Sequence, residues 1–516
     1  MTSARMLIAA GTCALLAACG TTVPAAQQLS SSDGSGLGGL DGSTPTSEAS
    51  SPSALGQGGG STGTTGLTSL PGQSRSFSTT GGTTTGALPG PGSTTGGQVP
   101  TSGALTIPTK GLGWDSKSVY VGFPTENDTQ KAVAALGVSF DPGDLPSMVH
   151  AAIGLANSHG GLFGRKLVPL MHDNSTVAIE TNPSSVAAEN CSYFTQDNRV
   201  AVFINALPAI TMPPCMHRAR VPDFEMSSVL MTSKTYRDYG PYLWTTEMPN
   251  ADRLARAYVD RMVAANYFTG WDTTNGKAGK AAVKVGIFEP NTAEGTSIIA
   301  TLSSLLKARG IQVAATFSYT DSVGSYSGEM RSAALKFASA GVTHVLNIPP
   351  IAAVLLFFMQ SAENQHYRPR YAFTSYSLPS QSGSYPAAQL PGTLGLGLDP
   401  GVDVPTPIVL NAPAKACVAA MRSAGVDIGT PFKESNALLV CDNVNLFVAA
   451  AKAGRGLDAG AIGRGMGLAG PTYRPALAFS SGLTGDNHGL PGSTRDLRYD
   501  TGCGCFSYTS GPHPIP

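Results

Sequence analysis

The stretch Asn157–Ser175, NSHGGLFGRKLVPLMHDNS, sets three glycines, an arginine and a lysine between two regular segments. Before it, apolar residues recur at spacings of three and four over 145–156, which predicts a helix. After it, the run KLVPLMHD is typical of a strand. A phosphate-binding loop follows a strand and opens a helix, whereas these glycines follow a helix and open a strand. We therefore expect a structural turn, with Gly160 or Gly161 as a left-handed helix cap and Gly164 in the turn itself.

Strands and helices alternate along the chain on both sides of this turn. Short apolar runs are typical of strands buried in parallel sheets, as in VYVGF (119–123), VAVFI (200–204) and VKVGIF (283–288). Helical patterns follow them, at 182–198, 252–267 and 294–310 among others. The series predicts an α/β protein with two doubly wound parallel-sheet lobes. Two later helices, 412–425 and 434–454, carry Cys417 and Cys441.

The N-terminal residues have the pattern of an export signal. Arg5 precedes an apolar segment that ends in LAAC, and the segment is too short for a comfortable permanent membrane span. This ending resembles the bacterial lipoprotein cleavage box, which implies a signal peptide over 1–18 and lipid attachment at Cys19. From Cys19 to residue 105 the chain is rich in Gly, Ser, Thr and Pro, which predicts a disordered stalk. Such a coil would have an rms reach of about 50 Å.

Composition excludes several classes of function. The chain has 33 basic and 33 acidic residues and no basic stripe, so a nucleic-acid partner is not expected. The folded part lacks a Gly-x-Ser-x-Gly elbow and His spacings typical of metal sites, so we expect no catalytic residues, metal or cofactor. One Gly-x-Gly-x-x-Gly occurs at Gly465–Gly470, but it does not follow a predicted strand. The region after residue 105 exceeds the size of one growing hydrophobic core, so two lobes are expected.

Six cysteines remain after Cys13 and Cys19 are set aside. Two local pairs share a separation of 24 residues, Cys191 with Cys215 and Cys417 with Cys441. Export permits disulfides, so we predict both bonds. Cys503 and Cys505 either bond directly, with strain, or each bonds elsewhere.

The order of elements resembles the type I periplasmic binding proteins, and most of all the leucine/isoleucine/valine-binding branch of ABC importer receptors. The residues that carry the resemblance are Asn157, Gly160, Gly161, Gly164, Arg165 and Asp173. The segments LWTTEMPNADRLARAYVD and VKVGIFEPNTAEG are also similar to that branch. The resemblance implies two lobes joined by a three-strand hinge, 106–246 plus about 403–478 and 247–402 plus about 479–516.

The same resemblance implies a function. The expected protein is a monomer, lipid-anchored to the outer face of the cell membrane, that closes on a small polar ligand and delivers it to ABC permease subunits. The alternative is a bilobed sensor that signals ligand occupancy to a membrane partner. In such folds the ligand lies beyond the carboxyl ends of the strands.

Candidate ligand-binding residues follow from that position. They lie in the loops after two strands of the first lobe, at the first crossover, and after two strands of the second lobe: Asn205, Ala206, Thr211, Ser227, Ser228, Thr246, Asn250, Asn291, Thr292, Ser375 and Tyr376. Asp252 is a candidate too, although capping of the next helix is an equal interpretation.

Both charge anchors of an amino-acid ligand are weakened in this sequence. Relatives hold the ligand carboxylate with hydroxyls and N–H groups in the loop after VAVFI, but here only Thr211 has a hydroxyl and Pro208 lacks an N–H. Relatives also place an acidic residue where this chain has Ser375 and Tyr376. A buried ammonium without a carboxylate is costly, so we expect a ligand other than a simple zwitterionic amino acid.

Overall fold

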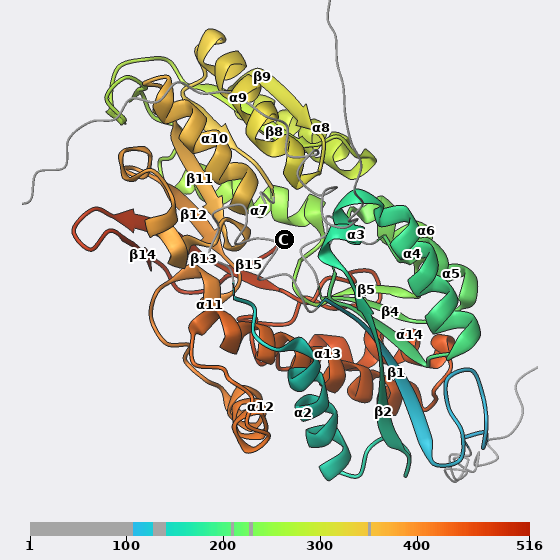
Figure 1. The fold of residues 1–516 in the computed structure, drawn as a ribbon. Coiled ribbons are helices and arrows are strands. Elements are labelled where there is room, and N and C mark those ends of the chain that lie inside the picture. Colours follow the sequence, from blue (N-terminus) through green and yellow to red (C-terminus); the bar gives the residue numbers. More distant parts are fainter. Residues whose placement is uncertain (1–106, 127–140, 208–210, 227–230, 349–351) are drawn as a thin grey trace, which may run out of the picture. The chain divides into compact units, whose positions relative to one another are not determined.

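The computed structural model of the protein describes residues 107–126, 141–207, 211–226, 231–348 and 352–516 (Figure 1). The predicted signal peptide, Cys19 and the stalk lie outside these residues, as do Ser227 and Ser228. The first sheet has the strand order β2-β1-β3-β4-β5, and every neighbouring pair is parallel. Its strands are β1 (Ser118–Glu126), β2 (Lys166–Asn174), β3 (Val202–Asn205), β4 (Asp223–Glu225) and β5 (Leu243–Thr245).

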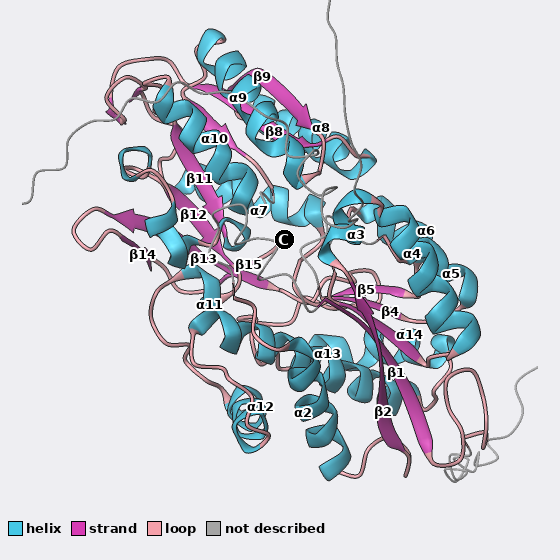
Figure 2. Cartoon of the chain, in the orientation of Figure 1, coloured by secondary structure: helices cyan, strands magenta, loops and turns pink. Residues whose placement is uncertain are grey.

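Helices cover both faces of the first sheet (Figure 2). One face packs into a common core with α2 (Leu145–Ser158), α12 (Ala412–Ser423), α13 (Pro431–Gly454) and α14 (Ala459–Ala469). The other face packs against α3 (Thr176–Thr181), α4 (Pro183–Ser192), the π-helical turn η2 (Tyr193–Asp197) and α5 (Pro213–Ala219). The predicted doubly wound arrangement is therefore confirmed for this sheet.

The second sheet has the order β14-β13-β12-β11-β10-β8-β9. Its parallel part contains β8 (Lys284–Pro290), β9 (Gln312–Tyr319), β10 (His344–Leu346), β11 (Arg370–Thr374) and β12 (Leu394–Gly397). One face packs against α7 (Ala251–Ala264) and α8 (Ala293–Lys307), the other against α9 (Val323–Ser339) and α10 (Ala352–Asn364).

The second sheet is not wholly parallel, which differs from the expectation. Strand β13 (Ser493–Asp500) pairs antiparallel with β12, and β14 (Cys505–Tyr508) and β15 (His513–Pro514) pair antiparallel with β13. The C-terminal segment thus adds an antiparallel edge to the parallel strands. The remaining elements are β6 (Trp271–Asp272), β7 (Lys277–Ala278), α6 (Ser233–Tyr239), α11 (Pro400–Asp403), η3 (Ser375–Ser377), η4 (Pro379–Ser384), η5 (Ala387–Gln389) and η6 (Gly470–Thr472).

The glycine-rich turn between α2 and β2 is structural, as predicted. Gly160, Gly161 and Gly164 have φ angles of 89°, 63° and 76°, which lie in the left-handed region. Arg165 is only 7% exposed. Its guanidinium donates to the backbone oxygens of Asp115 (2.6 Å) and Pro108 (2.9 Å). The arginine is therefore already used by the chain, and it leaves no anion site here.

Three disulfides join the six described cysteines. Cys191–Cys215 and Cys417–Cys441 are formed, as predicted from their shared separation of 24 residues. Cys503 bonds Cys505 directly, which settles the alternative that the sequence left open.

Helix α13 is long and apolar enough to cross a membrane by length and composition alone. In the fold, 67% of its most apolar window is buried, and it contributes to the core of the first sheet.

Candidate functional site

Both sheets contain the same parallel order, and this order locates a candidate site. In β2-β1-β3-β4-β5 the direction of winding reverses between β1 and β3, and in β9-β8-β10-β11-β12 it reverses between β8 and β10. Ligands of open α/β sheets bind at such switch points, outside the carboxyl ends of the strands. The candidate site therefore consists of the residues that end these strands.

At the end of β3, Asn205 is buried, and its side chain forms hydrogen bonds within the protein. Its Nδ2 donates to Glu225 Oε2 at 2.9 Å, and its Oδ1 accepts from Leu207 N at 3.1 Å. Ala206 is partly exposed and Thr211 is exposed. A ligand at this edge would meet the backbone of residues 205–207 before the Asn205 side chain.

In the segment after β5, the side chains that were predicted to bind the ligand also form hydrogen bonds within the protein. Thr246 is buried, and its hydroxyl donates to Asn443 Oδ1 at 3.1 Å. Asn250 is the N-cap of α7 and accepts from Asp252 N (3.0 Å) and Arg253 N (3.3 Å). The interpretation of Asp252 as the cap is wrong, because its Oδ2 instead accepts from Ser233 N at 2.8 Å.

Glu247 was missed by the sequence argument, although it lies between two predicted residues. Its backbone oxygen accepts from the Tyr376 hydroxyl at 3.0 Å. Its side chain is partly exposed, and its carboxylate has no hydrogen bond to any described residue. Burial, and then the nearby Asp399 carboxylate, raise the pKa of Glu247 to about 8. The Glu247 carboxyl group is thus available to bind a ligand.

The pH dependence of stability follows from this carboxyl group. Between its ordinary pKa of 4.5 and about 8, the folded protein keeps a proton that the unfolded chain has lost. The free energy of unfolding therefore decreases as the pH rises through that window. Glu247→Gln is expected to reduce this decline, as measured by melting temperature between about pH 5 and pH 8. Equal declines in the variant and the parent protein would contradict the assignment.

In the second sheet, two predicted residues lie on the surface and two are buried. Asn291 and Thr292 are exposed, and Thr292 caps α8 by accepting from Gly295 N at 3.0 Å. Ser375 is buried, and its Oγ accepts from Leu398 N at 2.7 Å. Tyr376 is 8% exposed. Asn291 and Tyr376 remain the predicted residues best placed to meet a solute.

Three buried polar residues that were not predicted from the sequence lie at the ends of the adjacent strands β8, β10 and β11. Glu289 Oε1 accepts from Ile348 N at 2.7 Å, but Glu289 Oε2, Asn347 Nδ2 and Thr374 Oγ1 have no partner among the described residues. Burial raises the pKa of Glu289 well above its usual value. The signal was present in the sequence, because each residue is a polar end to an apolar strand run: VKVGIFE, VTHVLN and YAFT.

Charge is distributed unevenly along this edge. At this edge lie the last two residues of each parallel strand and those of the next two residues that the structure describes. They contain no lysine, arginine or histidine, but they contain the acids Glu126, Asp173, Glu225, Glu247, Glu289, Asp321 and Asp399. The described part of the site is therefore rich in acceptors and poor in fixed positive charge.

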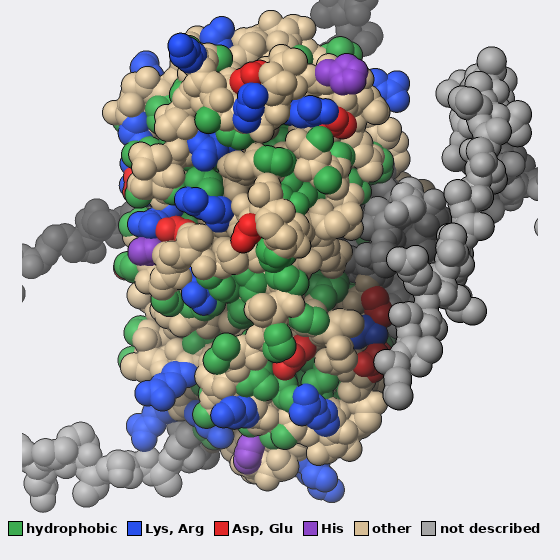
Figure 3. Space-filling view, turned by 90° about the vertical axis from the view of Figure 1, so that its left-hand side faces the viewer, with side chains coloured by type: hydrophobic (Ala, Val, Ile, Leu, Met, Phe, Trp, Pro, Cys, Tyr) green, Lys and Arg blue, Asp and Glu red, His purple; other side chains and the backbone are tan. Residues whose placement is uncertain are grey.

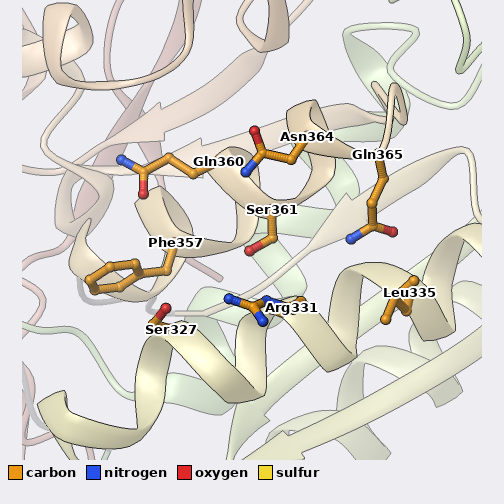
Figure 4. Close-up of a pocket in the computed structure, with 8 residues that line it drawn as sticks. All are labelled: Ser327, Arg331, Leu335, Phe357, Gln360, Ser361, Asn364 and Gln365. Atoms are coloured by element: carbon orange, nitrogen blue, oxygen red, sulfur yellow. The ribbon is translucent and has the colours of Figure 1, made fainter. Parts of the chain in front are cut away.

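Two surface grooves lie elsewhere in the described structure. One, of 290 Å³, lies between α9 and α10 and is lined mainly by polar side chains, with Arg331, Leu335, Phe357 and Gln360 among them (Figure 4). The other, of 470 Å³, is lined by residues 411–413, 471–475 and 478–481. The first belongs to a helical surface over one sheet face, so it is separate from the strand ends.

The face drawn in Figure 3 shows no basic stripe, and the described residues contain no metal site. On the face drawn in Figure 3, lysines and arginines are spread over the surface and do not form one basic stripe. Within the described ranges, no group of three or more His, Cys, Asp or Glu residues has the geometry to hold a metal ion.

Comparison with known proteins identifies the fold. No protein-family profile matches the sequence, and no curated protein matches it. Solved structures do match. A branched chain amino acid ABC transporter from Thermus thermophilus with bound valine aligns with 77% of this chain and 97% of its own, with a TM-score of 0.56 and 14% identity.

Two further structures show the same similarity. A type 1 periplasmic binding protein from Bordetella pertussis Tohama I aligns with 77% of this chain and 100% of its own, with a TM-score of 0.54 and 16% identity. The substrate-binding protein LivJ from Streptococcus pneumoniae, in complex with isoleucine, aligns over 77% and 100%, with a TM-score of 0.52 and 13% identity. The chain therefore has the type 1 periplasmic binding protein fold.

Proposed function

We propose that this protein binds a small polar solute at the strand carboxyl ends, without changing it chemically, and delivers it to an ABC importer. The observation that carries the proposal is the pair of sheets with the same 2-1-3-4-5 order, whose strand ends carry Glu247, Glu289 and Asn347. Solved structures with this fold support it, since one is a branched chain amino acid ABC transporter protein with bound valine and another is a branched-chain amino acid transporter substrate-binding protein in complex with isoleucine. The two predicted lobes and their hinge would enclose the solute.

A thermal-shift screen of the purified full chain tests solute binding. A ligand that binds only the folded state at a hundred times its Kd adds about 2.7 kcal/mol to the free energy of unfolding. We expect at least one solute from a panel of amino acids, amides, amines and organic acids to raise the melting temperature in a saturable way. A panel that includes branched-chain amino acids and leaves the melting temperature unchanged throughout would contradict the proposal.

The anchoring proposal is tested at Cys19. The LAAC ending supports lipid attachment there, so the full chain expressed in a bacterium should enter the detergent phase on phase separation. Cys19→Ser is expected to shift the mature protein to the aqueous phase. Mass spectrometry of the N-terminal peptide checks the same point, because a lipidated peptide should be present only with Cys19. Equal partition of both proteins, with an unmodified peptide, would contradict lipidation.

Import and sensing differ in their partners. An importer component requires permease and ATPase subunits, whereas a sensor requires a membrane receptor. We propose import, because the solved structures with this fold include transporter proteins, one of them from an ABC transporter. Genes for a permease and an ATPase beside the gene for this chain would support import. A neighbouring receptor gene and no transporter genes would favour sensing.

A further inference from the structure

We propose that the solute carries a cationic group and no carboxylate, and that the Glu247 carboxylate binds the cation. This inference rests on the proposed solute-binding function and deepens it by naming the class of ligand. Three independent features of the strand ends support it: the helix N-termini, the charges, and the surroundings of Glu247.

In three helices that follow strand ends, α7, α8 and α5, the chain itself bonds or lacks some of the first N–H groups. Helix N-termini attract anions because their first N–H groups lack partners within the helix. In α7 the Asn250 side chain occupies two of these groups, and in α8 Thr292 occupies one. In α5, which follows β3, the first two residues are Pro213 and Pro214, which have no N–H. A ligand carboxylate would therefore find few free donors there.

The charges at the same edge also disfavour a carboxylate. The described strand ends hold no basic side chain, as shown above, while Glu225 ends β4 beside the buried Asn205. A carboxylate placed here would lose its hydration and gain no positive partner, which is costly. A cation placed here would gain acceptors on several strands.

The Glu247 carboxylate, unlike its acidic neighbours, accepts no hydrogen bond from a described residue. The neighbouring Asp399 accepts from the Ser435 hydroxyl at 2.6 Å and from Gly401 N at 2.7 Å. Asp403 accepts from the Tyr508 hydroxyl at 2.6 Å. The Glu247 carboxylate has no hydrogen bond to any described residue, and Glu247 is partly exposed. A ligand cation would form an ion pair with this carboxylate.

The environment of Asp403, which lies near Asp399, also favours a cation. Asp403 is fully buried, and its Oδ1 has no partner among the described residues. The titratable groups that act on Glu247 or are acted on by it are Asp399, just before α11, and Tyr376 on η3. Asp403 on α11 and Tyr236 on α6 lie near Tyr376, and Tyr508 on β14 lies near Asp399 and Asp403. Arg495 is the nearby base, and its guanidinium lies 3.9 Å from the Tyr508 ring centroid. Burial raises the pKa of Glu247 and of Asp403, and a bound cation would favour their charged forms.

The proton on Glu247 gives the proposal a distinct signature. With its pKa raised to about 8, this carboxyl group is mostly protonated in the free protein at neutral pH. A cation that pairs with the carboxylate must displace that proton. Affinity should therefore weaken by about tenfold for each pH unit below the pKa, and binding should release a proton.

The test uses matched sets of solutes on the full chain. One set is 3-methylbutylamine, 4-methylpentanoate and leucine, which share one branched carbon chain and differ only in their charged groups. Similar sets with linear, aromatic and diamine chains widen the panel. The proposal predicts that an amine raises the melting temperature more than its matched acid and amino acid. Isothermal titration of that amine in buffers of different ionisation enthalpy should then show proton release.

The variants Glu247→Gln and Glu189→Gln form a matched pair. Glu189 lies on α4 with 66% of its side chain exposed, so Glu189→Gln should bind the amine as the parent protein does. Glu247→Gln should bind it at least tenfold more weakly and lose the proton release. Glu247→Gln is close in shape and keeps the neutral form that burial favours, so its own melting temperature reports whether it folds.

The outcomes separate this inference from the proposed function. If an acid or amino acid binds and its matched amine does not, the inference is overturned and solute binding stands. Amine binding that Glu247→Gln leaves unchanged also overturns the assignment of Glu247. If no solute binds, both the inference and the proposed function fail.

Discussion

Gly465→Val is expected to lower the free energy of unfolding by about 3 kcal/mol or more. A Cβ atom built on Gly465 would lie 1.7 Å from the backbone oxygen of Ala450, where α14 packs against α13. The contact is reciprocal, because a Cβ on Gly454 of α13 would lie 1.8 Å from the oxygen of Ala461 on α14. Backbone atoms cannot rotate away as side chains do, so the helices must separate. Denaturant titration of the variant and the parent protein measures the effect.

Gly467→Val is the matched control within the same helix. A Cβ there would meet Gly485 Cα at 3.6 Å, which is an ordinary contact. Valine is no worse than glycine in a helix, so we expect a change within about 1 kcal/mol. Equal effects of the two substitutions would show that close helix packing is not the reason for Gly465. Of the three glycines in the Gly-x-Gly-x-x-Gly pattern, Gly465 is the one that the contact between α14 and α13 requires.

Asp442→Ala is expected to destabilise the protein by about 3 kcal/mol. Asp442 is buried on α13 and accepts from Ala476 N (2.7 Å), Leu477 N (3.0 Å) and the Tyr473 hydroxyl (2.9 Å). Removal of the carboxylate leaves these buried donors without an acceptor. The change is measured by denaturant unfolding followed by circular dichroism.

Asp442→Asn provides the control, because the amide oxygen keeps one acceptor in the same place. It should cost clearly less than Asp442→Ala. Burial raises the pKa of Asp442 to about 6, so the carboxylate itself is held at a cost that its hydrogen bonds offset. If alanine were no worse than asparagine, the hydrogen bonds to Ala476 and Leu477 would not be important for the fold.

The parallel strands were predictable, and the C-terminal strands were not. β1, β3 and β8 are apolar runs between helical patterns, so local sequence alone indicated them. Strand β13, STRDLRYD, has no such pattern. It is a strand because its backbone pairs with β12 on one side and β14 on the other, which is a tertiary effect. Helix α14 was obscured by its glycines, which lower helix propensity but permit the close approach to α13.

The candidate site was harder to predict than the fold. The order of strands and helices alone was enough to predict the edge of the sheets at which a ligand is expected. Which polar residue faces a ligand depends instead on where each helix begins. Asn250 and Thr292 were predicted to contact the ligand, but each caps a helix that starts at the next residue. Glu247 was missed, because the lack of a partner for its carboxylate appears only after the neighbouring strands and loops are in place.

The most direct test of the proposed function is backbone hydrogen exchange of the full chain, with and without the solute that stabilises it most. Exchange reports local opening, so a bound solute protects the amides around it. We expect protection in the segments that follow the strands of both sheets: 205–207, 246–250, 291–292, 347–348 and 375–377. The groove between α9 and α10 should exchange equally in both states. Protection confined to that groove, or to one sheet alone, would contradict binding between two lobes at the strand carboxyl ends.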